Sequence, residues 1–169
     1  MVESLERATG SAPVLIANAA DAAAWRPGLR VVPDVLPDIG SLGGILTAVE
    51  VLGAALCVAW DMPFLPAELL AALASGLGDA DAVVPESPSR RGLEPLCAAY
   101  GPACGPAIRA AVARGDQRAV GFHADVRVVR LPRDAVLQYG DPAVLFFNVN
   151  TPDDLARAEE LCRNRGSSR

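Results

Sequence analysis

Short, continuous apolar runs alternate along the chain with longer segments whose apolar residues recur at the period of a helix. Residues 54–61, AALCVAWD, have the character of a strand that is buried on both faces of a parallel sheet. The pattern predicts strands at 12–18, 29–34, 54–61, 80–86, 124–131 and 143–150, with 92–101 as a further candidate, and helices at 41–53, 65–78, 106–116 and 151–165. We therefore expect an α/β fold with an open, mostly parallel sheet and helices on both faces, and one domain over residues 1–169.

Composition and charge narrow the possible functions. The chain carries a formal net charge of −5 at pH 7, which argues against a general nucleic-acid binder because such proteins have a basic face. Its basic residues are all arginine, and His123 is its only histidine, which excludes a His-rich metal site. The four cysteines include no Cys-x-x-Cys pair and lie in apolar contexts, so buried, reduced thiols are expected.

The chain shows no sign of a targeting or membrane segment. Its first ten residues, MVESLERATG, include two glutamates and lack the apolar region of a signal peptide. The longest apolar run, residues 51–60, is shorter than the roughly 20 residues that cross a bilayer. We expect a cytoplasmic protein that binds neither nucleic acid nor membrane.

Several polar residues follow predicted strands at the point where each strand ends. Asp61 closes the buried run 54–61, Asn18 and Asp34 close the first two strands, and Asn148 and Asn150 lie at the end of 143–150. In an open parallel sheet, ligands bind beyond the carboxyl ends of the strands. A carboxylate there can hold Mg²⁺, which usually completes its shell with substrate phosphates, although an aspartate before Met-Pro can equally cap a turn. The glycines of GSLGG (40–44) open a helix whose free N–H groups could meet an anion, or they allow close packing.

Five segments, in their order and spacing, resemble the molybdenum cofactor guanylyltransferase (MobA) family: IAN, VVPDVLPDIGSLGGI, AWDMPFLP, GLEPLCAAY and FFNVNTPDDLARAEEL. The resemblance covers nearly the whole chain, and DMPFLP and NVNTPDDL are its most specific parts. It implies a Rossmann-like nucleotidyltransferase fold and the Mg²⁺-dependent transfer of GMP from GTP to Mo-molybdopterin. It also implies molybdoenzymes or other proteins of cofactor biosynthesis as partners.

The resemblance assigns roles to the residues at the strand ends. Asp61 becomes the catalytic metal ligand, Asn18 and Asp34 lie in the GTP site, and Asn148 and Asn150 lie beside the reacting phosphates and the pterin. Arg90 and Arg91 could face the molybdopterin phosphate or lie in a solvated loop.

The sequence departs from the family at its beginning. The family starts with a strand and a glycine-rich loop of the form LAGG-x-S-x-R-M-G-x-D-K, whereas residues 1–7 resemble the end of the helix that follows this loop. We therefore expect an N-terminally incomplete domain without its first strand, in which GMP transfer is slow. A cytidylyltransferase or sugar nucleotidyltransferase on the same fold, and a non-catalytic molybdopterin-binding protein, remain the alternatives.

Overall fold

A computed structural model describes residues 1–89 and 92–166 of the chain. Its helices are α1 (Val2–Thr9), α2 (Ala22–Trp25), α3 (Ser41–Leu52), α4 (Ala67–Ser75), α5 (Cys104–Ala113), α6 (Arg133–Leu137), α7 (Pro142–Leu145) and α8 (Pro152–Gly166), with short 3-10 turns at Gly76–Gly78 and His123–Asp125. Its strands are β1 (Val14–Ile16), β2 (Arg30–Val32), β3 (Ala55–Val58), β4 (Ala82–Pro85), β5 (Cys97–Tyr100) and β6 (Val128–Leu131). The α/β class and all but one of the predicted strands and helices are confirmed.

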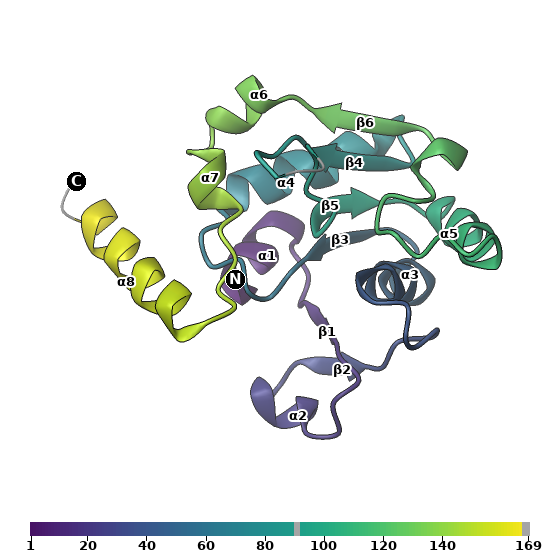
Figure 1. Cartoon of the computed structure of the whole chain (residues 1–169), viewed down its shortest axis with the longest axis horizontal. Helices are drawn as coiled ribbons and strands as arrows, with labels where there is room; N and C mark the ends of the chain where they lie inside the picture. Colours follow the sequence, from purple (N-terminus) through teal and green to yellow (C-terminus); the bar gives the residue numbers. More distant parts are fainter. Residues whose placement is uncertain (90–91, 167–169) are drawn as a thin grey trace.

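The strands form two separate sheets (Figure 1). Strands β3, β5, β4 and β6 make a four-stranded sheet in that order, while β1 and β2 pair in parallel as a two-stranded sheet. The larger sheet is mixed, because β5 runs antiparallel to both of its neighbours and β4 and β6 are parallel. The expected mostly parallel sheet therefore differs from the structure at β5. Only residues 86–96 join β4 to β5, and parallel strands need a crossover of a dozen or more residues.

Residues 143–150, predicted as a buried strand, contain no strand. Asp141 caps α7 by accepting a hydrogen bond from the Ala143 N–H, and Pro142 occupies the first helical turn, where its missing N–H costs nothing. Leu145 and Phe146 are buried in the core as strand residues would be, which explains why the apolar run suggested a strand. The segment from Phe147 to Asn150 is then irregular until α8 begins.

Two apolar clusters cover the two faces of the larger sheet, as the pattern predicted. On β4 and β5, side chains alternate between the clusters: Val84 and Tyr100 pack with α3 and α5, whereas Val83 and Cys97 pack with α4. The strands β3, β4 and β6 share one direction, so their carboxyl ends lie at one edge of the sheet. The described part of the chain includes no helix that is long and apolar enough to cross a membrane.

All four cysteines are free thiols. Cys97 and Cys104 are buried and Cys57 is partly buried, as expected, but Cys162 is exposed on α8. Burial raises the pKa of the Cys57 thiol to about 12, which keeps it protonated and weakly nucleophilic.

Candidate functional site

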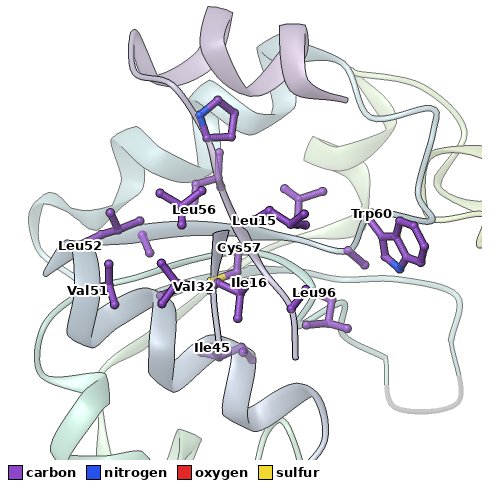
Figure 2. A pocket seen from close by; sticks show the side chains of 18 of the residues that line it. Leu15, Ile16, Val32, Ile45, Val51, Leu52, Leu56, Cys57, Trp60 and Leu96 are labelled. Atoms are coloured by element: carbon purple, nitrogen blue, oxygen red, sulfur yellow. The ribbon is translucent and has the colours of Figure 1, made fainter. Parts of the chain in front are cut away.

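A cavity of about 720 Å³ lies between the two sheets and is lined by residues of both β1 and β3. Each of these strands pairs with a neighbour on one side only, so each leaves an edge without a strand partner among the described residues. Figure 2 shows aliphatic side chains of β1, β2, α3 and β3, including Leu15, Ile16, Val32 and Leu56, gathered in its interior, with Trp60 at one end. Its interior is apolar and includes the open edges of β1 and β3, where a further strand could pair, so the polar groups that can orient a ligand are the few that follow the strands.

The polar residues that line the cavity include three of the predicted site residues, each of which follows a strand: Asn18, Asp34 and Asp61. The others, Thr9, Ser11 and Ser41, lie on or next to helices. The two aromatic residues among its lining residues, Trp25 and Trp60, were not predicted from the sequence. The structure therefore brings these three predicted residues to one cavity.

Asn18 and Asp34 are bonded to each other. The Asn18 Nδ2 donates to Asp34 Oδ2 at 2.8 Å, and the Asp34 N–H donates to Asn18 Oδ1 at 2.8 Å. The parallel register explains this pairing, because Ile16 lies opposite Val32 and the residues two positions further on are then opposite each other. These two residues form one unit at the ends of β1 and β2.

Thr47 on α3 supports this unit, and sequence reasoning missed it. Its side chain is fully buried, accepts a hydrogen bond from the Val35 N–H at 2.9 Å, and donates one to the Gly43 carbonyl at 2.8 Å. The Thr47 hydroxyl also lies 3.4 Å from Asp34 Oδ1. It thereby fixes the backbone that follows Asp34 against α3. A threonine inside an apolar helical pattern was the available signal.

Gly43 explains part of the GSLGG segment. A Cβ at this position would lie 2.9 Å from the Leu36 carbonyl oxygen, 3.2 Å from Ile39 Cγ1 and 3.3 Å from Asp34 Oδ2. Only a residue without a side chain lets α3 approach the Asp34 carboxylate this closely. Of the two interpretations of these glycines, Gly43 supports close packing.

Asp61 lies beyond β3, next to the NVN segment. Its backbone carbonyl accepts a hydrogen bond of 2.9 Å from the N–H of Val149, which lies between Asn148 and Asn150. The three side chains Asp61, Asn148 and Asn150 have no hydrogen-bond or ion-pair partner within residues 1–89 and 92–166. Their oxygen and nitrogen atoms are thus available to a ligand.

The start of α8 holds the NVN segment in place. The Asp154 carboxylate accepts hydrogen bonds from the N–H groups of Asn150 and Thr151 and from the Thr151 hydroxyl, while the Asp154 N–H donates to Thr151 Oγ1. These reciprocal hydrogen bonds make Thr151 the capping residue of α8. The Thr151 hydroxyl is the main cause that lowers the pKa of Asp154, followed by the Asn150 N–H.

The donor set around Asp61 suits one kind of metal. No group of three or more His, Cys, Asp or Glu side chains among the described residues could enclose an ion. Mg²⁺ does not need such a cage, because it commonly takes one or two carboxylates and fills its shell with water and substrate phosphates. Asp61, with a carboxylate that no described residue engages, fits this role. Arg90 and Arg91, the candidate phosphate contacts, lie outside the described residues.

Comparisons with known proteins show what the chain is similar to. Residues 1–130 match the family described as the MobA-like NTP transferase domain. A probable molybdenum cofactor guanylyltransferase of Pelotomaculum thermopropionicum is 34% identical over 160 residues, which cover 94% of this chain and 77% of that protein. The molybdenum cofactor guanylyltransferase of Mesorhizobium japonicum is 34% identical over 154 residues, 84% of this chain and 71% of that protein.

A solved structure extends the likeness to three dimensions. Molybdopterin-guanine dinucleotide biosynthesis protein A from Archaeoglobus fulgidus matches with a TM-score of 0.79 at 28% identity, covering 96% of this chain and 85% of that one. These findings confirm the resemblance predicted from the sequence.

Proposed function

Because the chain belongs to the MobA-like NTP transferase family, we propose that it transfers GMP from GTP to Mo-molybdopterin, releasing pyrophosphate and forming the guanine dinucleotide cofactor. The family and the curated relatives make it a nucleotidyltransferase of the molybdenum cofactor guanylyltransferase type. The observation that carries the residue-level proposal is the Asp61 carboxylate. It follows β3, lines the cavity and has no partner among the described side chains.

In the proposed reaction, an oxygen of the molybdopterin phosphate attacks the α-phosphorus of GTP in line with the leaving group. One phosphorus–oxygen bond forms to this phosphate, the bond from the α-phosphorus to the bridging oxygen breaks, and pyrophosphate departs with the electron pair. Such transfers require little covalent chemistry from the protein, which contributes position and charge. Mg²⁺, when bound, supplies positive charge beside the transferring and leaving phosphates.

Asp61 would hold that cation, since it is the cavity's carboxylate without a partner in the described structure. Asn148 and Asn150 would donate hydrogen bonds to phosphate or pterin oxygens from their free amides, next to Asp61 through the Val149 contact. Asn18 and Asp34 would bind the nucleoside part of GTP. Their mutual bonds leave one amide hydrogen and several carboxylate lone pairs for a ligand.

Residues 1–169 would then form a single nucleotidyltransferase domain, with the cavity between its two sheets. Residues 1–169 contain no lysine, so the triphosphate charge would be met by the cation, by backbone N–H groups and by arginine.

The test is Asp61→Asn, which keeps the shape of the side chain and removes its charge. GMP transfer should fall by about 10²-fold or more, the scale of a single group that stabilises transition-state charge, while the unfolding transition stays near that of the parent. Asp79→Asn is the matched control, because Asp79 is exposed and precedes β4 at the opposite edge of the sheet. Near-normal turnover of Asp61→Asn at ordinary Mg²⁺ would contradict the assignment.

The same assay separates the alternative functions. Parallel reactions with GTP, CTP and UTP distinguish a guanylyltransferase from other nucleotidyltransferases on this fold. Binding of molybdopterin without any nucleotide turnover, in a protein that is folded, would favour the non-catalytic alternative.

A further inference from the structure

The only two tryptophans of the chain stack on each other, and both line the cavity. Trp25 is the last residue of α2, and Trp60 follows β3 and directly precedes Asp61. Their ring centroids are 5.4 Å apart and their planes are inclined by 12°. The pair therefore spans the gap between the part of the chain around β2 and the larger sheet.

Both rings remain unusually open to solvent. Trp60 is 74% exposed and Trp25 is 44% exposed, although tryptophan buries more apolar surface than any other side chain when it is covered. A residue that served only to join the two sheets would gain most by burying both of its faces. Trp60 instead has one face against Trp25 and most of its remaining surface in water.

Trp25 gives this surface a fixed orientation. Its indole Nε1 donates a hydrogen bond of 3.2 Å to Asp21 Oδ2, one turn earlier, which restricts the rotation of the ring. Trp60, stacked almost parallel on Trp25, is thereby also restricted. A flat, apolar, pre-oriented face beside a carboxylate suits the ring of a ligand whose phosphates lie at that carboxylate.

We propose that the open face of Trp60 stacks on a fused substrate heterocycle that contains a 2-amino-4-oxopyrimidine ring, the ring that guanine and pterins share. This proposal rests on the proposed function, since that function supplies substrates with such rings. Trp60 would be a specificity-determining residue that binds the ring while Asp61, its neighbour in sequence, serves the phosphates. Trp25 would be a positioning residue that holds Trp60.

Stacking predicts a selective loss of affinity. Trp60→Ala should weaken binding of the ring-bearing substrate by about 5- to 150-fold, the range found when an aromatic side chain that stacks on a base is replaced by alanine. Trp60→Phe should restore most of the affinity, because phenylalanine keeps a π face. The effect should appear mainly in KM, since stacking holds the ring equally in the ground state and in the transition state.

Tryptophan fluorescence can report the contact directly, because Trp25 and Trp60 are the only tryptophans of the chain. In the Trp25→Phe variant the emission comes from Trp60 alone, and we would titrate it with Mg²⁺-GTP, with pterin-6-carboxylate and with Mg²⁺-tripolyphosphate. Quenching by GTP assigns the stacking to the guanine, and quenching by the pterin assigns it to the pterin. Tripolyphosphate has no ring and should leave the emission unchanged, and its affinity should be equal in the parent and in Trp60→Ala.

A control and a distinct readout separate stacking from a structural role. Leu137→Ala removes a side chain that is 53% exposed on α6, outside the cavity, and should change neither affinity nor KM. If Trp60→Ala lowers the unfolding midpoint but leaves KM for both substrates unchanged, and neither ring quenches Trp60, the proposal is overturned. That result would leave the guanylyltransferase assignment intact, provided that GMP transfer persists. Quenching by a ring without any GMP transfer would instead contradict the proposed function and keep the stacking site.

Discussion

Replacing Gly43 by alanine should destabilise the protein, whereas the same change at its neighbour Gly44 should stabilise it. Both residues lie in the first turn or so of α3, where alanine is a better helix former than glycine by about 1 kcal/mol. A Cβ at Gly44 meets nothing within 4 Å, so this gain should appear undiminished. A Cβ at Gly43 would lie 2.9 Å from the Leu36 carbonyl oxygen, closer than such contacts allow.

The magnitude follows from the two opposing effects. Overpacking at Gly43 costs about 1–3 kcal/mol, because the obstacle is backbone and cannot rotate away as a flexible side chain would. After subtraction of the helix propensity, Gly43→Ala should lose between about 0 and 2 kcal/mol of unfolding free energy. The two variants should therefore differ by about 1–3 kcal/mol, or several degrees in Tm for a chain of this size.

Urea unfolding monitored by circular dichroism gives the free energy of unfolding of each variant. The comparison is matched because both variants replace a glycine of α3 by alanine. Gly43→Ala should also weaken Mg²⁺-GTP binding, since its Cβ would lie 3.3 Å from Asp34 Oδ2 and move that carboxylate relative to Asn18. If both variants gained the same stability and bound GTP equally, residues 36–39 would be able to move away from the added Cβ at little cost in free energy. The close approach of α3 would then not be what positions Asp34.

Further predictions address other parts of the site and the core. Thr47→Val should cost about 1–3 kcal/mol in urea unfolding by leaving the Val35 N–H without its acceptor, whereas Thr47→Ser should retain most of the stability. Burial, and secondarily Arg130, lowers the pKa of His123 to about 4, below its unfolded value of about 6.5. The unfolded state therefore binds the proton more readily, and the free energy of unfolding should decrease as the pH falls from about 6.5 to 4. His123→Gln should reduce this pH dependence when urea unfolding is measured across the same range. Residues 1–169 assayed by themselves should transfer GMP more slowly than a version extended by a strand and a glycine-rich loop of the family's form, because the edges of β1 and β3 have no strand partner in the described structure; equal rates would contradict this.

Local patterns predicted the elements well because they report which residues are buried and at what period. The helical period of 41–53 and the continuous run at 54–61 correspond to α3 and β3. The direction of β5 was not predictable in this way, since apolar periodicity is the same for both directions of pairing. It depends instead on the short connection 86–96, whose isolated bridge between Glu86 and Leu93 already starts an antiparallel return.

At residues 143–150 the apolar pattern predicted burial correctly but secondary structure wrongly. Its apolar residues are indeed partly buried, but α7 and an irregular segment bury them, and length alone could not distinguish this from a strand. The error did not affect the candidate site, because the Val149 N–H still bonds to the Asp61 carbonyl. The pairing of Asn18 with Asp34 depends on strand register, which a single sequence does not provide. The stacking of Trp25 on Trp60 was not predicted because the two residues lie far apart in the chain.

The hydrogen bonds of Asp34 and Asp61, the two aspartates that line the cavity, indicate different roles for them. Asp34 already accepts a bond from Asn18 and lies against Thr47, so part of its charge stabilises the junction of β1, β2 and α3. A cation bound there would compete with these donors and would disturb the backbone that they hold. The Asp61 side chain makes no hydrogen bond to any described residue, and only its backbone carbonyl accepts one, from the Val149 N–H. A metal ion can therefore bind the Asp61 carboxylate without breaking a structural hydrogen bond, which favours Asp61 over Asp34 as the ligand on energetic grounds that are independent of the family resemblance.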